Sequence, residues 1–209
     1  MNNCYLDAEA VITFFRMTGR KHIFITGSRG SGKSHLVNNM LKHMSDSFNL
    51  LQSHRTDTPQ VVIKSNLVAG NKEFVIGVPR TSGINPASKG NNMTIIEDGF
   101  INCAIPAIDT HLDTTPERLF VIDELGYLES SCIPFQKAVE KLLDNSHVLA
   151  VIRKQSTEFL NRICNRKDVL VIDIDSTFET LSCIIMASGM SKRFGSNKLI
   201  TDFNGRSLF

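Results

Sequence analysis

Residues 27–34, with the sequence G-S-R-G-S-G-K-S, have the glycine, lysine and hydroxyl spacing of a loop that binds a polyphosphate. An apolar run at residues 23–25 precedes the loop, and apolar residues of 34–44 recur at helical spacing. In such a strand–loop–helix unit, the loop N–H groups and the positive end of the helix face the phosphates. Lys33 is then expected on the β- and γ-phosphates, and the Ser34 hydroxyl on Mg²⁺. The candidate nucleotide-binding residues are Gly27, Ser28, Arg29, Gly30, Ser31, Gly32, Lys33 and Ser34.

A second group of candidate residues follows the apolar run Leu119–Ile122, which is typical of a central parallel strand covered on both faces. Asp123, directly after this run, would lie beside the loop and hold Mg²⁺ through the metal's water shell or the Ser34 hydroxyl. Glu124 could then act as the general base on the attacking water. The alternative interpretation of residues 27–34 is a glycine-rich turn, and that of Asp123 and Glu124 is two solvated acids at a strand end. The joint presence of the two motifs favours the chemical interpretation.

Several cations could approach the same phosphates. Arg153 and Lys154 end the predicted strand Val148–Ile152, and ligands bind outside the carboxyl ends of parallel strands. One of them could stabilise the γ-phosphate as an arginine finger does, and Arg153 is our candidate catalytic residue. A solvated strand end is the alternative, and the sequence does not decide between the two cations. Arg29 could lie over the phosphates or face solvent, and Arg80 is a candidate substrate contact.

The elements that must position these residues alternate between strand and helix. Asp7 is expected to cap a first helix that buries Val11, Phe14 and Phe15 on one face. Further helices are expected at residues 34–44, 103–112, 135–143 and 157–164. Strands are expected at residues 23–26, 61–63, 74–76, 119–122, 148–152 and 169–172, with a long loop or flap at 79–92. This alternation predicts an α/β fold, a three-layer sandwich with a mostly parallel central sheet and right-handed crossovers.

Composition narrows the class of protein. A chain of 209 residues is long enough for one sizeable α/β domain, and its net charge of +2 does not suggest nucleic acid or a membrane as partner. We see no signal peptide and no apolar stretch long enough to span a bilayer. The five cysteines show no C-x-x-C spacing: Cys4, Cys103, Cys132, Cys164 and Cys183. This pattern favours reduced thiols and a cytoplasmic protein over a disulfide framework or a zinc site.

Taken together, these motifs resemble the THEP1-type nucleoside-triphosphatases, a family of P-loop NTPases. The resemblance is carried by residues 27–34, by V-I-D-E-L-G at 121–126, by Glu129 before an amphipathic helix, and by R-I-C-N-R-K-D-V at 162–169. It covers about residues 20–180 and implies a RecA/ASCE-like P-loop fold. It also implies Mg²⁺-dependent hydrolysis of NTP to NDP and phosphate, with broad base tolerance and slow turnover.

The resemblance also implies roles for individual residues. Gly32, Lys33 and Ser34 would bind phosphate and metal, Asp123 would hold the metal, and Glu124 would be the base. The chain departs from the family pattern at two places in the loop. Where members usually have Thr-Thr after the lysine, it has Ser34 and a histidine, which keeps the metal-binding hydroxyl. The glutamate and proline often found early in the loop are replaced by serine and arginine, which could change nucleotide preference or rate.

The C-terminal segment, residues 182–209, resembles a different family. The sequence C-I-I-M-A-S-G-M-S-K-R-F-G at 183–195, with Lys198 and G-R-S-L at 205–208, is similar to the start of the MobA-like nucleotidyltransferases. In that family a small-residue turn wraps an NTP, and Arg193 and Lys198 would neutralise its phosphates. We expect a truncated start of such a domain, which cannot transfer nucleotides by itself. A basic, glycine-containing tail is the alternative.

These observations predict three segments: an N-terminal helix at 1–20, a P-loop NTPase domain at 21–181 and the nucleotidyltransferase-like start at 182–209. The expected activity is hydrolysis of ATP, GTP and other NTPs. Two alternatives stay open. One is a kinase for a nucleotide or other small hydroxyl substrate. The other is an NTP-dependent switch module that serves a fused or partner nucleotidyltransferase in molybdenum-cofactor maturation. Base preference, physiological substrate and oligomeric state do not follow from the sequence.

Overall fold

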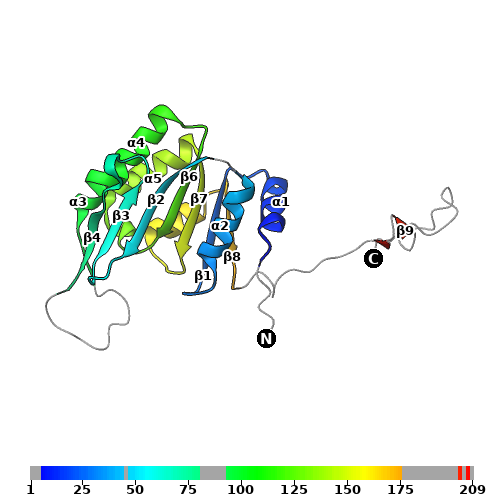
Figure 1. The fold of residues 1–209 in the computed structure, drawn as a ribbon, viewed down its shortest axis with the longest axis horizontal. Coiled ribbons are helices and arrows are strands. Elements are labelled where there is room, and N and C mark those ends of the chain that lie inside the picture. The colour runs from blue at the N-terminus through cyan, green and yellow to red at the C-terminus, as the bar shows by residue number, and fades with distance from the viewer. Residues whose placement is uncertain (1–5, 45–46, 81–92, 176–201, 204–205, 208–209) are drawn as a thin grey trace. The chain divides into compact units, whose positions relative to one another are not determined.

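The computed structural model describes residues 6–44, 47–80 and 93–175, and the short pairs 202–203 and 206–207. The chain divides into two units, residues 1–177 and 178–209 (Figure 1). In the second unit, β9 (Asp202–Phe203) pairs antiparallel with β10 (Arg206–Ser207). The other residues of the nucleotidyltransferase-like pattern lie outside the described residues. None of the described helices is long and apolar enough to cross a membrane.

An eight-stranded sheet organises the described part of the first unit, in the order β5-β4-β3-β2-β6-β7-β1-β8. The strands are β1 (His22–Gly27), β2 (Phe48–Arg55), β3 (Val61–Ser65), β4 (Phe74–Pro79), β5 (Met93–Ile95), β6 (Leu119–Leu125), β7 (His147–Arg153) and β8 (Val169–Asp173). The run β2-β6-β7-β1-β8 is parallel throughout. The strand before the phosphate loop, β1, is thus separated from the acid-bearing strand β6 by β7 alone, so their carboxyl ends share one edge of the sheet.

Half of the sheet departs from the simple strand–helix alternation. Strands were predicted at the positions of β3 and β4, but both are antiparallel, and β2, β3 and β4 follow one another without a crossover helix. β5 also pairs antiparallel with β4. β2 was not predicted, because its second half, Q-S-H-R, is polar; Ser53, His54 and Arg55 of this half line the cavity described below. The predicted loop at 79–92 begins one residue early, since Pro79 is still in β4; residues 81–92 lie outside the described residues.

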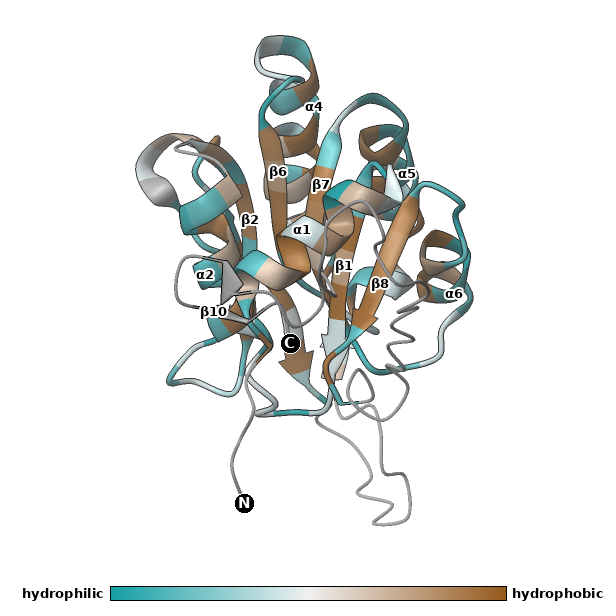
Figure 2. Cartoon of the chain, turned by 90° about the vertical axis from the view of Figure 1, so that its right-hand side faces the viewer, coloured by the Kyte–Doolittle hydropathy of each residue, from teal (hydrophilic) through white to brown (hydrophobic). Residues whose placement is uncertain are grey.

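Helices cover both faces of the sheet and confirm the three layers. They are α1 (Ala8–Thr18), α2 (Lys33–Met44), α3 (Glu97–Gly99), α4 (Ile105–Thr114), α5 (Ile133–Asn145) and α6 (Glu158–Cys164), with the π-helix η2 (Phe100–Ala104) and short 3₁₀ turns η1 (Ala69–Asn71) and η3 (Glu129–Ser131). One apolar core joins α1 and α2 to the sheet, and a second joins η2, α4, α5 and α6 to its other face. Figure 2 shows the central strands as largely hydrophobic, as burial on both faces requires.

Two helices differ from their predicted form. In α1, the Asp7 side chain caps the helix by accepting the Ala10 N–H at 3.2 Å, as predicted. Phe14, however, is 55% exposed, and Ile12 is buried in its place, so the inward stripe follows i, i+3, i+4 spacing from Ala8. The helix predicted at 103–112 runs instead from α3 through the π-helix into α4.

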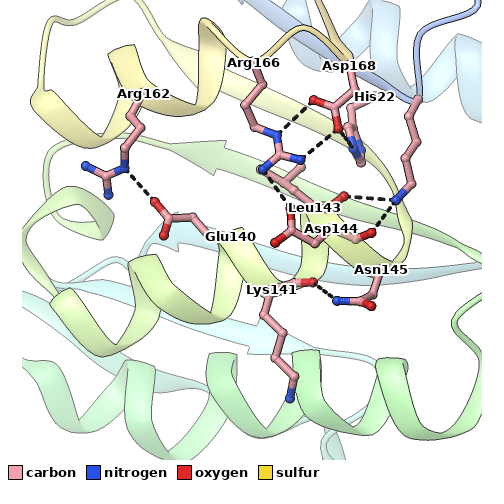
Figure 3. Close-up of polar contacts among 10 residues, drawn as sticks. His22, Glu140, Lys141, Leu143, Asp144, Asn145, Arg162, Arg166 and Asp168 are labelled. Carbon is pink, nitrogen blue, oxygen red and sulfur yellow. Dashed lines mark hydrogen bonds and ion pairs between the residues drawn. The ribbon is translucent and has the colours of Figure 1, made fainter.

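A polar network lies at the amino-terminal ends of the parallel strands, away from the ends that carry the loop after β1 and the acids of β6 (Figure 3). Arg166 donates to Asp168 through Nε–Oδ1 (2.9 Å) and Nη2–Oδ2 (2.8 Å), and its Nη1 lies 2.9 Å from Asp144 Oδ1. Lys21 Nζ donates to the carbonyls of Leu143 (3.1 Å) and Asp144 (2.9 Å). The first residue of β1, His22, is fully buried beside this network. These contacts tie the start of β1 to the end of α5 and the start of β8.

Candidate nucleotide-binding site

The loop after β1 has the predicted strand–loop–helix form, with α2 beginning at Lys33. Gly30 and Gly32 have φ of 77° and 94°, a left-handed region that favours glycine. Lys33 Nζ donates to two carbonyls of its own loop, those of Gly27 (2.9 Å) and Ser28 (2.7 Å). The lysine is therefore held over the loop by weak neutral acceptors, which phosphate oxygens can replace.

Asp175, just past β8, anchors the first turn of the loop. Its carboxylate accepts the Ser28 N–H at 2.7 Å and the Ser28 hydroxyl at 3.1 Å. Lys154 Nζ lies 3.0 Å from the same carboxylate and 2.8 Å from Asp173 Oδ2, and Lys154 lowers the pKa of Asp175. Lys154 is thus engaged by Asp173 at the end of β8 and by Asp175 just after it, as Arg153 is engaged by Glu124. Asp175 could not be predicted from the sequence, because its partner Ser28 is remote in the chain.

Asp123 lies on β6 and is held by the neighbouring strand. Gln52 of β2 is its register partner, and Gln52 Nε2 donates to Asp123 Oδ2 at 2.8 Å. One carboxylate oxygen is thereby fixed. The other has no hydrogen bond to a described residue and stays available to a ligand. Gln52 was missed because β2 was not predicted.

Glu124 occupies a distorted position of β6. Its φ is 81°, and the register between β6 and β7 shifts between Ile122 and Leu125. A β-bulge changes the direction in which a side chain points. A non-glycine residue with a positive φ of this size has a strained backbone. The Glu124 carboxylate meets Arg153 of β7 in a two-point ion pair, through Nε–Oε1 and through Nη2–Oε2 at 3.1 Å. The predicted base and the predicted finger are therefore bound to each other in this structure.

Two further residues shape this corner, Gly126 and Glu129. A Cβ at Gly126 would lie 2.8 Å from Cδ of Arg153, so glycine lets the arginine chain pass. Glu129 is 5% exposed and accepts the Gly126 N–H at 2.9 Å. Burial is the main cause that raises the pKa of the Glu129 carboxyl, and Arg153 opposes it. Glu129 is part of the sequence pattern that resembles the family, but no role was predicted for it.

A cavity of about 510 Å³ joins these groups. Of the predicted residues, it is lined by Gly27, Ser28, Arg29, Gly30, Lys33, Ser34, Asp123, Glu124 and Arg153. Ser31 and Gly32 are not in the lining; the Ser31 hydroxyl turns back to donate to the Ser28 carbonyl at 2.7 Å. The cavity also reaches Lys154, the other cation that the sequence offered for the γ-phosphate. Its further lining residues, for which the sequence predicted no role in binding, are Ser53, His54, Arg55, Val61, Tyr127, Leu128, Glu129, Val151 and Gln155.

Known proteins share this sequence pattern. A family model described as NTPase matches residues 22–178. The chain is 25% identical over 155 residues to a protein named nucleoside-triphosphatase THEP1 from Thermotoga sp. (strain RQ2), which covers 73% of this chain and 86% of that one. A protein of the same name from Thermotoga maritima is 23% identical over 154 residues, with the same coverage of 73% and 86%.

Solved structures share the fold. The crystal structure of THEP1 from the hyperthermophile Aquifex aeolicus superposes with a TM-score of 0.58 at 17% identity, over 75% of this chain and 92% of that one. The solution structure of a human cancer-related nucleoside triphosphatase gives a TM-score of 0.54 at 20% identity, over 73% and 88%. These likenesses confirm the predicted α/β fold. Since the family model spans well over half of the sequence, the chain belongs to the NTPase family, and the predicted resemblance to its THEP1-type members is confirmed.

Proposed function

We propose that this chain hydrolyses nucleoside triphosphates to the diphosphate and phosphate with Mg²⁺. The observation that carries the proposal is the single cavity that holds the phosphate loop, Asp123 and Glu124 together. These groups come from β1 and β6 and meet because only β7 lies between the two strands.

The residues present suit magnesium. The Ser34 hydroxyl and the Asp123 carboxylate both line the cavity and offer the hard oxygen ligands that Mg²⁺ prefers. Within the described ranges, no three or more His, Cys, Asp or Glu side chains cluster to enclose a metal. Water and phosphate oxygens would therefore complete the coordination. When bound, the ion neutralises charge on the β- and γ-phosphates.

Phosphate binding would change the partners of two cations. Lys33 would exchange the carbonyls of Gly27 and Ser28 for phosphate oxygens, which are stronger acceptors because they are charged. A γ-phosphate beside Arg153 would compete with Glu124 for the guanidinium. We infer that the arginine moves to the phosphate and that this releases the Glu124 carboxylate.

The released carboxylate would then serve as the base. Water attacks the γ-phosphorus, its proton passes to Glu124, and the bond from the γ-phosphorus to the bridging oxygen breaks as NDP leaves. Lys33, Arg153 and the loop amides would stabilise the charge that develops on the transferred group. The proton returns to solvent or to the phosphate product, which leaves Glu124 ready for the next cycle.

The test is phosphate release from ATP, GTP, CTP and UTP with Mg²⁺. Hydrolysis without any acceptor is expected, with NTP binding lost in Lys33→Ala and hydrolysis but not binding lost in Glu124→Gln. Lys137→Ala, on the exposed side of α5, is the control and should behave as the intact chain. If the intact chain binds NTP and releases no phosphate, the hydrolase proposal is wrong.

A kinase is the second candidate. The observation that favours it is the extension of the cavity to Ser53, His54 and Arg55 of β2, which offers room for an acceptor. A kinase forms NDP only when an acceptor is present and releases no matching free phosphate. Measuring NDP and phosphate in the same sample separates the two activities.

We also propose that residues 182–209 begin a MobA-like nucleotidyltransferase domain, separate from an NTPase domain at 21–181 and a first helix within 1–20. The residue pattern of the tail supports this proposal. If the NTPase instead acts as a switch for such a domain, hydrolysis should be slow alone and should rise when a partner is added. A chain that ends at residue 181 should keep its hydrolysis rate, and loss of that rate would contradict the division into domains.

The free thiols of Cys103, Cys132 and Cys164 support a location in the cytoplasm.

A further inference from the structure

The cavity extends past the position that the terminal phosphate would take. The phosphate loop follows β1, and β2 lies three strands away, beyond β7 and β6. At the usual strand spacing, the end of β2 is about 14 Å from β1, one strand beyond Asp123. Yet Ser53, His54 and Arg55 of β2 still line the cavity. This lobe therefore lies on the side of the metal-binding position away from the loop.

One wall of the lobe is formed by Arg55, Val61 and Tyr127. Arg55 and Val61 are register partners on β2 and β3. Arg55 follows Leu51 by four residues on β2, so the two side chains lie on the same face of the sheet. Leu51 belongs to the core cluster against which Tyr127 packs. The arginine and the tyrosine thus belong to the same face of the sheet and line the same cavity.

The guanidinium of Arg55 in this lobe has no counter-ion among the described residues. Arg55 is exposed and makes no hydrogen bond or ion pair with any described side chain. The Tyr127 phenol is half-buried; burial raises its pKa, whereas Arg153, Arg55 and Arg80 lower it. The buried carboxyl nearby, Glu129, is already hydrogen-bonded to the Gly126 N–H. Arginine without a counter-ion beside a tyrosine hydroxyl is a fitting partner for a phosphate group.

We propose that Arg55 and Tyr127 form a second anion subsite, which binds a small phosphate monoester at the same time as the nucleoside triphosphate. The proposal rests on the proposed function, because the triphosphate must fill the loop side of the cavity. The guanidinium of Arg55 holds two phosphate oxygens, and the Tyr127 hydroxyl donates to a third. The second ligand lies next to the γ-phosphate, on the side from which a nucleophile enters.

Tyrosine fluorescence can report on this subsite. The chain has no tryptophan and two tyrosines, Tyr5 and Tyr127, so a Tyr5→Phe chain carries Tyr127 as its single fluorophore of this type. The chain is saturated with Mg²⁺ and a β,γ-imido triphosphate and then titrated with glycerol 3-phosphate. Inorganic phosphate and glycerol are titrated separately, to distinguish an ester from the free anion and from the alcohol.

A saturable change with one glycerol 3-phosphate per chain is expected, with no response to glycerol. Arg55→Gln should weaken this binding at least tenfold and leave the affinity for the triphosphate analogue within about twofold. Arg118→Gln, an equal loss of charge at an exposed position at the opposite edge of the sheet, is the control and should change neither affinity.

Three results would overturn the subsite: no second binding event while the analogue is bound, equal binding in Arg55→Gln and the control, or an equal loss of both ligands in Arg55→Gln. In the third case Arg55 belongs to the triphosphate site. Saturable binding of inorganic phosphate but not of the ester would also contradict the proposed ligand class. Failure of the analogue itself to bind would count against the proposed NTPase function, which keeps the two failures distinguishable.

Discussion

Two arginine–carboxylate pairs lie at opposite ends of the parallel strands, and their surroundings differ. At the end where the strands begin, Arg166 holds Asp168 by two hydrogen bonds and also meets Asp144 (Figure 3). At the end where they finish, Arg153 holds Glu124 by two hydrogen bonds. The first pair joins a network on ordinary backbone. The second stands on a bulge with Glu124 at a φ of 81° and lines a cavity.

The difference fits a structural role for the Arg166–Asp168 pair and the proposed catalytic role for the Arg153–Glu124 pair. Backbone strain of this kind costs roughly 1–3 kcal/mol and persists where the surroundings enforce it, often at active sites. Lys33, close to the second pair, is bonded to loop carbonyls alone among the described residues, and Arg55 has no described partner. Bound phosphate groups would supply charged acceptors for Lys33 and Arg55, which the described residues do not.

The largest effect is expected from neutralising each carboxylate in turn. Glu124→Gln should lower kcat by about a hundredfold to ten-thousandfold while NTP still binds, because the general base is lost. Asp168→Asn should leave kcat within about twofold and lower the free energy of unfolding by roughly 1–3 kcal/mol, because charged hydrogen bonds are lost. Urea unfolding and phosphate release on both variants make the comparison. A similar fall of kcat in both would erase the distinction between the two ends.

Acid should lower the stability of the fold through His22, at the start of β1. Burial, the main cause, lowers the pKa of His22 to about 4; Asp168 opposes this, and Lys21, Arg166 and His147 add to it. The unfolded chain therefore binds the proton first as pH falls below about 6.5, and stability is lost between about pH 6.5 and pH 4, by about 3 kcal/mol in all. Arg166 lowers the pKa of Asp168 to about 2, so the stability that Asp168 contributes is lost only below about pH 4.

Urea unfolding at several pH values between 7 and 4 measures this loss. His22→Leu removes the titrating group, so the variant should show a flatter dependence of unfolding free energy on pH. An unchanged slope in His22→Leu would assign the acid sensitivity to other groups.

A smaller effect is expected at Gly126. In Gly126→Ala the new Cβ, 2.8 Å from Cδ of Arg153, should push the arginine away from Glu124. We expect kcat to fall about tenfold, since a displaced catalytic group loses its geometry. The unfolding free energy should change little, because the displaced atoms belong to a flexible side chain. Should stability fall and kcat stay constant, Gly126 would belong with the structural end of the sheet.

The smallest effect is expected at Gln52. Its amide donates to Asp123 Oδ2, so Gln52→Ala should raise the Mg²⁺ concentration for half-maximal hydrolysis by about threefold to tenfold and alter kcat at saturating Mg²⁺ less. The control is Asn161→Ala, on α6, whose side chain bonds only Ser156 among the described residues. Mg²⁺ titrations that coincide for Gln52→Ala and the control would show that Gln52 does not position Asp123.

Sequence reasoning worked best where the signal is local. The loop with its glycines, the apolar runs of β1, β6 and β7, and the helical spacing of α2 and α5 all predicted elements that the structure contains. It failed at β2, where polar residues facing the cavity hide the strand. It also placed Phe14 inward, because a helix stripe read from three residues can be rotated onto its neighbour.

The sequence by itself determined the strand–loop–helix unit at residues 27–34, because positive φ at glycines, an apolar run and helical periodicity act within a few residues. It also indicated which acids and cations are chemically suited to a triphosphate. The tertiary structure decided how they pair: Arg153 with Glu124, Gln52 with Asp123, Asp175 with Ser28. Each of these contacts joins neighbours in the strand order β2-β6-β7-β1-β8 or the segments that follow such strands. That order is set by the packing of the two cores and cannot be read from short stretches of sequence.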